Sequence, residues 1–120
     1  MDKKVILVVD DAPENIDLLV GLLREKFVVK AARNGEVALK IARRQLPDAI
    51  LLDIVMPGMD GYQVCEALRN DATTASVPVI FVSGEMGTDD CSRAEQLNAE
   101  TLAKPVDPEK LMELLDELLQ

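Results

Sequence analysis

Residues 5–11 of the chain have the sequence VILVVDD, and this segment is the strongest single indication of the fold. Five consecutive apolar residues are typical of a strand that is covered on both faces, as the strands of parallel sheets are. The apolar residues that follow are spaced as on one face of a helix: Ile16, Leu19, Val20 and Leu23. The sequence therefore predicts a strand-and-helix unit whose strand ends in two acids.

The same unit recurs four more times along the chain. Further strands are predicted at residues 27–32, 49–52, 78–82 and 101–103. Further helices are predicted at residues 35–44, 61–69 and 86–97, and a last helix is predicted from residue 108 to the final residues, 118–120. Asp60 and Gln63 predict a capping box at one helix, and Asp107 with Pro108 predicts the start of the last. Lys30 interrupts its apolar run, which favours an edge strand.

Alternating units of this kind, joined by right-handed crossovers, predict an α/β fold. We expect a (βα)5 flavodoxin-like, doubly wound parallel sheet with strand order 2-1-3-4-5. Ligands of such sheets bind outside the carboxyl ends of the strands where the order reverses, here between the first and third strands. A length of 120 residues suits a single core, so we expect one domain over residues 1–120.

The composition excludes several classes of function. The net charge of -9 repels phosphate backbones, so we expect no direct binding to nucleic acid. The chain has no histidine, which excludes histidine-based acid–base catalysis and histidine metal sites. Aromatic residues make up 2% of the chain, too few for a platform that stacks bases or flavin.

The sequence also favours a cytoplasmic location. No apolar run approaches the roughly 18 residues of a membrane helix, so we expect no membrane partner. The apolar run at residues 5–9 is too short for the core of a signal peptide. Cys65 and Cys91 lie far apart in a chain without a secretion signal, which predicts reduced thiols. We expect Cys65 to be a packing residue of the helix at residues 61–69.

Polar side chains stand at the carboxyl ends of four predicted strands. In strand order they are Asp10 with Asp11, then Asp53, Ser83 and Lys104. These four strands are neighbours in the order 2-1-3-4-5, so three carboxylates, one hydroxyl and one ammonium should meet at one edge of the sheet. The remaining strand ends at Arg33, to which we assign nothing comparable.

The charge of this edge points to a chemistry. Two carboxylates about 4 Å apart repel each other by about 4 kcal/mol at an effective dielectric of about 20, so three of them need protons or a cation. A set of oxygen ligands suits Mg²⁺. The ammonium of Lys104 and the hydroxyl of Ser83 are what an incoming phosphoryl group needs. Asp53 is then a candidate nucleophile that would form an aspartyl phosphate.

Each of these residues also has an ordinary structural explanation when taken alone. Asp11 could cap the first helix ahead of Pro13. Asp53 and Ser83 could be turn residues, and Lys104 could be a solvated lysine. Turn residues need not place acids, a hydroxyl and an ammonium on four adjacent strand ends, so the joint pattern favours the functional explanation.

Five motifs appear in order along the chain. The longest is PDAILLDIVMPGMDGY at residues 47–62, and the others are VVDD at 8–11, NGEVAL at 34–39, PVIFVSG at 78–84 and Lys104-Pro105. With these motifs at these intervals, the chain resembles the receiver domain of bacterial two-component response regulators over essentially its whole length.

This resemblance implies a metal-dependent phosphoacceptor site. Asp53 would take a phosphoryl group from the phosphohistidine of a sensor histidine kinase or a phosphotransfer protein. Asp11 and Asp53 would bind Mg²⁺, or Mn²⁺ in its place, directly. Asp10 would act through water, and the backbone carbonyl of Val55 would complete the protein ligands.

The resemblance also implies how the phosphoryl group is held. Ser83 and Lys104 would contact its oxygens, Ser83 would shift toward it on activation, and the Lys104-Pro105 bond would be cis. The chain would act as a phosphoacceptor switch in a phosphorelay, not as an enzyme, with at most self-catalysed phosphorylation and dephosphorylation.

The output surface would comprise the helix at 86–97, the strand at 101–103 and the helix at 108–118. It would control a downstream protein or a covalently attached effector domain, and a homodimer through the same face is compatible with this. One position departs from the family: Thr101 stands where receivers commonly carry a Tyr or Phe that rotates on activation. Asp89 and Asp90 suit the positive end of a helix dipole, and we assign them no chemistry.

Three other functions remain as alternatives. A phosphatase or phosphotransferase with an aspartyl phosphate usually needs a second acid two residues after the nucleophile, where this chain has Val55. Flavodoxin-like electron transfer conflicts with Asp10 and Asp11, which would repel a flavin phosphate. A receiver-like module that binds partners without phosphate is disfavoured because every expected site residue is present.

Overall fold

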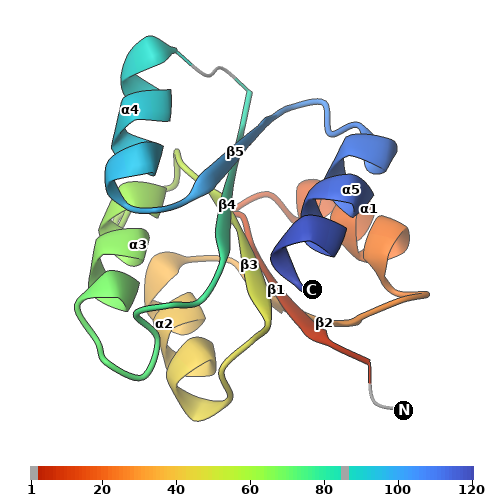
Figure 1. The fold of residues 1–120 in the computed structure, drawn as a ribbon, viewed down its shortest axis with the longest axis horizontal. Coiled ribbons are helices and arrows are strands. Elements are labelled where there is room, and N and C mark those ends of the chain that lie inside the picture. Colours follow the sequence, from red (N-terminus) through yellow and green to blue (C-terminus); the bar gives the residue numbers. More distant parts are fainter. Residues whose placement is uncertain (1–2, 85–86) are drawn as a thin grey trace.

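The computed structural model describes residues 3–84 and 87–120, which form one sheet with helices on both faces (Figure 1). The strands are β1 (Val5–Val9), β2 (Val28–Ala32), β3 (Ala49–Asp53), β4 (Val79–Ser83) and β5 (Glu100–Ala103). The helices are α1 (Pro13–Leu23), α2 (Gly35–Arg44), α3 (Gly61–Arg69), α4 (Thr88–Gln96) and α5 (Pro108–Leu118). The predicted alternation of strands and helices is confirmed.

The strands pair in the order β2-β1-β3-β4-β5, and every pairing is parallel. This confirms the predicted doubly wound α/β sheet. In β1, Val9 lies opposite Ala32 on one side and Leu52 on the other. The winding reverses between β1 and β3, so the chain leaves these two strands toward opposite faces and an opening remains at their carboxyl ends.

The sheet separates two apolar layers. Alternate residues of β1 point to opposite faces, so Leu7 packs with α2, α3 and α4, whereas Ile6 packs with α1 and α5. Figure 1 shows the same division, with α2, α3 and α4 on one side of the sheet and α1 and α5 on the other. Because both faces are covered, β1, β3 and β4 are apolar almost throughout, as predicted from their continuous runs.

Element boundaries differ from the predicted ones by one or two residues. β2 begins at Val28, one residue later than expected, and β5 begins at Glu100, one residue earlier. Pro78 lies before β4 because it has no N–H to donate, although its carbonyl accepts from Ile50 N–H at 2.9 Å. α4 begins at Thr88, and the predicted start at Met86 lies outside the described residues.

The caps of the helices agree with the sequence in two cases. Asp60 and Gln63 form the predicted reciprocal capping box at α3. At α5, the Asp107 carboxylate accepts from Glu109 N–H at 3.0 Å. The cap of α1 is Ala12, which makes no side-chain hydrogen bond, so the alternative in which Asp11 caps this helix is wrong.

α4 is the least firmly packed helix. Of its nine residues, all described by the structure, only Ala94 is buried. α5, on the other face, buries Leu111 and Leu115 completely. A helix that buries so little apolar surface costs little to displace, because burial supplies roughly 25 cal/mol per Å².

Two further expectations concern the cysteines and the membrane. Cys65 is fully buried in the layer of α3, as predicted, and Cys91 is exposed on α4; both are free thiols. Within residues 3–84 and 87–120, no helix has the length and apolar character that crossing a membrane requires.

Gly61 allows the start of α3 to approach the end of β3, and this contact supplies the first prediction. A Cβ at Gly61 would lie 2.3 Å from the carbonyl oxygen of Asp53 and 2.8 Å from the Cα of Ile54. Both neighbours are backbone atoms that cannot rotate away. We expect Gly61→Ala to lower the free energy of unfolding by about 1–3 kcal/mol in urea denaturation.

Gly21 in α1 provides the matched control. A Cβ there would meet nothing within 4 Å. Gly21→Ala should therefore leave stability unchanged or raise it by up to about 1 kcal/mol, because alanine loses less backbone entropy in a helix. Equal effects of the two substitutions would show that the approach of α3 to β3 does not constrain this position.

Candidate functional site

Three carboxylates meet where the sheet winding reverses. Asp10 directly follows β1, and Asp53 is the last residue of β3. One carboxylate oxygen from each of Asp10, Asp11 and Asp53 lies within 4.8 Å of the others. Asp10 and Asp53 are buried, and Asp11 is half-buried. The structure therefore brings together the acids that the sequence placed on two non-consecutive strands.

Lys104 extends into this acidic cluster. Its Nζ lies 3.0 Å from Asp10 Oδ2 and 3.7 Å from Asp53 Oδ1. The side chain is only 25% exposed, so Lys104 is not an ordinary solvated lysine. Its backbone N–H donates to the Ser83 carbonyl at 2.8 Å, and the Lys104-Pro105 bond is cis. The end of β5 thus sets the ammonium between two of the three carboxylates.

Asp10 is held from two directions. Its Oδ2 accepts from Lys104 Nζ, and its Oδ1 accepts from Ala12 N–H at 2.9 Å. This bond keeps the turn before α1 closed over the cluster. Asp10 is consequently an acceptor with both oxygens engaged, whereas Asp11, with a half-buried carboxylate, is more open to solvent.

A cavity of about 650 Å³ opens above Asp53. It is lined by Asp53, Val55, Ser83, Gly84, Gly87, Asp90 and Lys104. Ser83 is the buried last residue of β4, so its side chain reaches the cavity from the strand next to β3. Val55 is 74% exposed at the rim. The cavity thus presents a carboxylate, a hydroxyl and an ammonium to one volume that is open to solvent.

The surroundings of Asp53 oppose its ionisation. Burial, followed by the negative charges of Asp10 and Asp11, raises its pKa to about 6 from the ordinary 3.8. The ammonium of Lys104 and a hydrogen bond from the Val55 backbone act in the opposite direction but do not cancel the rise. Near neutral pH the Asp53 carboxylate therefore carries unfavourable free energy that a further positive charge would relieve.

The donors of this cluster fit a hard divalent cation. Three carboxylates from Asp10, Asp11 and Asp53 offer only oxygen, and one ammonium offsets only part of their charge. Mg²⁺ prefers one or two carboxylates with waters and phosphate oxygens to complete its shell. The free volume above Asp53 leaves room for those ligands.

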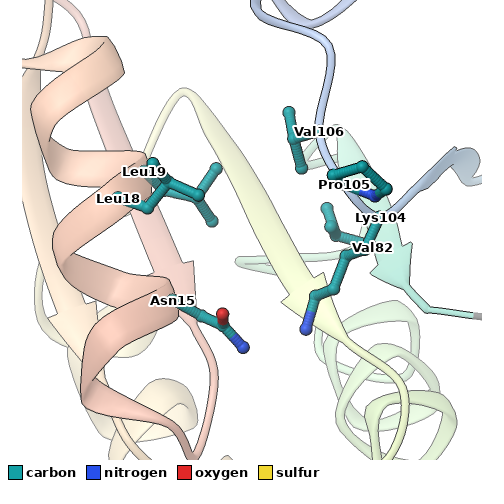
Figure 2. A pocket seen from close by; sticks show the side chains of 7 residues that line it. All are labelled: Asn15, Leu18, Leu19, Val82, Lys104, Pro105 and Val106. Carbon is teal, nitrogen blue, oxygen red and sulfur yellow. The ribbon is translucent and has the colours of Figure 1, made fainter.

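A second cavity borders the acidic cluster at Lys104. It has a volume of about 380 Å³ and lies between α1 and the segment after β5. Figure 2 shows its apolar wall with the Lys104 side chain at its edge. It is lined by Asn15, Leu18, Leu19, Val82, Lys104, Pro105 and Val106. Lys104 therefore borders both this apolar pocket and the polar cavity above Asp53.

Sequence reasoning missed two polar residues near the site. Arg33, at the end of β2, donates from Nη2 to the Asp11 carbonyl at 3.4 Å and lines a cavity of about 510 Å³ with Asp11. Asp90, on α4, lines the cavity above Asp53. The position of Arg33 after a strand was a usable signal. For Asp90 the sequence offered none, because its approach depends on how α4 packs.

Comparisons with known proteins agree with this architecture. The model of the family described as "Response regulator receiver domain" matches residues 6–116. Response regulator PleD of Caulobacter vibrioides is 44% identical over 104 residues, which cover 85% of this chain and 23% of PleD. Protein PilH of Pseudomonas aeruginosa is 38% identical over 116 residues, which cover 95% of this chain and 96% of PilH.

A solved structure extends the comparison. The receiver domain of the sensor histidine kinase PA1611 from Pseudomonas aeruginosa, described with a magnesium ion coordinated in its active site cleft, matches with a TM-score of 0.89. The two sequences are 29% identical, and the match covers 98% of each chain. The present chain thus spans less than a quarter of PleD but nearly all of PilH and of this receiver domain.

The raised pKa of Asp53 predicts how stability depends on pH without a divalent cation. A carboxyl whose pKa is about 6 when folded and near 3.8 when unfolded contributes its full stability below about pH 4 and loses it as pH rises through 6. Asp53→Asn removes the charge. We therefore expect it to raise the free energy of unfolding at pH 7.5 by about 2 kcal/mol, measured by urea denaturation in EDTA.

The same measurement at pH 4 should show little difference between Asp53→Asn and the wild type. Asp17→Asn is the control, because Asp17 is exposed on α1 and should change stability by less than about 0.5 kcal/mol at either pH. A gain for Asp53→Asn that is the same at pH 4 and pH 7.5 would contradict this account of the cluster.

Proposed function

This chain belongs to the response regulator receiver domain family, and from that premise we propose that Asp53 is the residue that accepts the phosphoryl group. Receiver domains act in the phosphorelays of two-component systems. The observation that carries the assignment is the position of Asp53 at the end of β3, beside two other carboxylates and 3.7 Å from an ammonium. Among the described residues that line the cavity, Asp53 is the one carboxylate that stands at a strand end, since Asp90 lies on α4.

The acidic cluster would hold the metal. We assign direct ligands to Asp11 and Asp53, a backbone carbonyl ligand to Val55, and a contact through water to Asp10. Mg²⁺, or Mn²⁺ in its place, supplies positive charge against the carboxylates and the phosphoryl oxygens when bound. The oxygen donor set and the magnesium ion described in the PA1611 receiver domain support this assignment.

The chain's own residues then have separate tasks in phosphoryl transfer. A carboxylate oxygen of Asp53 forms a bond to phosphorus while the bond from phosphorus to the donor's histidine nitrogen breaks, and the donor keeps that electron pair. The negative charge of the transition state spreads over three oxygens. Lys104 and Ser83, which border the same cavity, would stabilise that charge as an ammonium and a hydroxyl donor.

The partners follow from the family. We propose that a sensor histidine kinase or a phosphotransfer protein donates the phosphoryl group. The output would pass through α4, β5 and α5 to a downstream protein, an attached effector domain or a second copy of the chain, and the cytoplasm is the location we propose. On this account the chain is a phosphoacceptor switch, not an enzyme. The shallow packing of α4 supports a switch at this face.

Phosphorylation by a small donor tests the function directly. Incubation with acetyl phosphate and Mg²⁺ should add the mass of one phosphoryl group, read by intact mass spectrometry. EDTA should abolish the addition, as should Asp53→Ala, whereas Asp17→Ala should be modified like the wild type. If the wild type stays unmodified, or if Asp53→Ala is still modified, Asp53 is not the acceptor. A flavodoxin would instead purify with a yellow cofactor.

Lys104 supplies a second test, because we propose that it weakens Mg²⁺ binding but speeds phosphoryl transfer. Lys104→Ala removes a cation that competes with the metal for the acids, so Mg²⁺ should bind more tightly in isothermal titration calorimetry. The same change removes charge stabilisation of the phosphoryl group, so modification by acetyl phosphate should slow by about 100-fold or more. Lys26→Ala, at an exposed lysine, should alter neither. A loss of both activities would indicate that Lys104 only maintains the structure.

A further inference from the structure

Asp90 connects α3 to α4. It is the third residue of α4, and its Oδ2 accepts from Gly87 N–H at 3.0 Å, which caps the helix. Its Oδ1 accepts a short hydrogen bond from the hydroxyl of Tyr62, which lies on α3. The Arg93 guanidinium lies 3.7 Å above the Tyr62 ring. Each carboxylate oxygen of Asp90 therefore accepts one hydrogen bond, one from the start of α3 and one from the start of α4.

The same carboxylate borders the phosphoacceptor cavity. Asp90 lines that cavity together with Asp53, Ser83 and Lys104. Lys104 is the single basic residue among the described residues that line it, and it is already within 4 Å of Asp10 and Asp53. A phosphoryl group on Asp53 would thus add negative charge to a volume whose one described cation already pairs with Asp10 and Asp53, because Arg93 lies over the Tyr62 ring and does not line the cavity.

We propose that Asp90 is a further functional residue of the receiver site: it opposes the phosphoryl charge on Asp53 and transmits that repulsion through Tyr62 to the contact between α3 and α4. This inference rests on the proposed function, because it requires phosphorylation at Asp53. In the unmodified protein the Tyr62–Asp90 contact holds α4 on α3. In the phosphorylated protein the contact is weakened and α4 moves away from the cavity.

The charge that this mechanism needs is present at neutral pH. The Tyr62 hydroxyl, the Gly87 amide and then Arg93 hold the pKa of the Asp90 carboxyl below its ordinary value. A phosphoryl group carries about -1.5 to -2 charges at pH 7. Repulsion between the two is stronger in a partly enclosed cavity than in water, because the effective dielectric is lower.

The element that would respond is free to do so. Only Ala94 of the nine α4 residues is buried, and the contact between Arg93 and Glu66 of α3 is a long, exposed 4.0 Å pair. Few other interactions therefore oppose a displacement at the start of α4, whereas Arg69 of α3 donates to the carbonyls of Leu97 and Asn98 at its other end. By linkage, a contact that phosphorylation weakens must itself disfavour phosphorylation by the same factor.

In this mechanism Tyr62 takes the role of the aromatic switch residue that receivers commonly carry at the position of Thr101. In β5, Thr101 pairs with Phe81 and offers no ring to the switch. Tyr62 packs against Phe81 from α3, with the two ring centroids 5.2 Å apart. The aromatic side chain that contacts both the core and α4 thus comes from α3, not from β5.

Tyrosine fluorescence can measure the contact directly. Tyr62 is the only tyrosine and the chain has no tryptophan, so its emission is the intrinsic signal of the protein. A carboxylate that accepts the phenol hydrogen bond quenches that emission. We expect acetyl phosphate with Mg²⁺ to raise Tyr62 emission in step with the phosphorylated fraction, which intact mass measures in the same samples.

Two neighbouring acids provide a matched pair of variants. Asp90→Asn keeps an acceptor for the Gly87 cap but removes the charge, whereas Asp89→Asn removes the adjacent charge, which lies outside the cavity. We expect Asp90→Asn to have brighter unmodified Tyr62 and no further rise on phosphorylation. Its modification by acetyl phosphate should be about fivefold faster, because one negative charge fewer repels the incoming phosphoryl group. Asp89→Asn should behave like the wild type in all three measurements.

Tyr62→Phe keeps the ring but removes the hydroxyl, and it tests the same contact without altering charge. Its rate of phosphorylation should rise, and hydrogen exchange in α4 should already be fast before modification. Phosphorylation of the wild type without a change in Tyr62 emission would overturn the role of Asp90 and leave the proposed function intact. So would equal rates for Asp89→Asn and Asp90→Asn. Absence of phosphorylation in the wild type would overturn both.

Discussion

The acidic cluster holds more negative charge than the protein itself balances, and the rest of the site depends on this. Asp10, Asp11 and Asp53 bring carboxylate oxygens within 4.8 Å of one another, and Lys104 contributes a single ammonium. The imbalance appears in the pKa of Asp53, which burial and its acidic neighbours raise to about 6. A site with this deficit suits a divalent cation, which is the basis of the metal-dependent phosphoryl acceptance proposed for it. The same arrangement makes the metal-free fold less stable at neutral pH than it would be with a neutral residue at position 53.

The sheet places the acidic cluster beside α4, so a change in the charge of the cluster can act on that helix. β3 and β4 are buried throughout and cannot adjust easily, so the response to a new charge falls on the elements beside the cavity that are loosely packed. α4 is such an element, with a single buried residue, and it begins at the cavity wall. A buried strand end that carries the proposed acceptor and a sparsely packed helix that borders the same volume are the two parts that a charge-operated switch requires.

This chain departs from the family pattern at position 101, where receivers commonly carry an aromatic switch residue. Thr101 removes the ring that receivers commonly use at the start of β5, yet the site residues Asp53, Ser83 and Lys104 still surround one cavity. The aromatic contact with α4 is instead made by Tyr62. Thr101 therefore leaves the residues around the cavity in place, and in the proposed mechanism the aromatic contact with α4 comes from α3 and not from β5.

Much of this protein follows from local sequence. Continuous apolar runs predicted the covered strands, 3.6-residue periodicity predicted the helices, and the residues that end each strand predicted which groups would meet, because parallel strands bring their carboxyl ends to one edge. The tertiary structure alone decided the contacts of side chains on helices and edges. Asp89 and Asp90 are identical acids in adjacent positions, and only the packing of α4 against α3 turns one toward the cavity and Tyr62. Arg33 reaches the Asp11 carbonyl for a similar reason: a long side chain is directed by its neighbours in space, on which spacing along the chain carries no information.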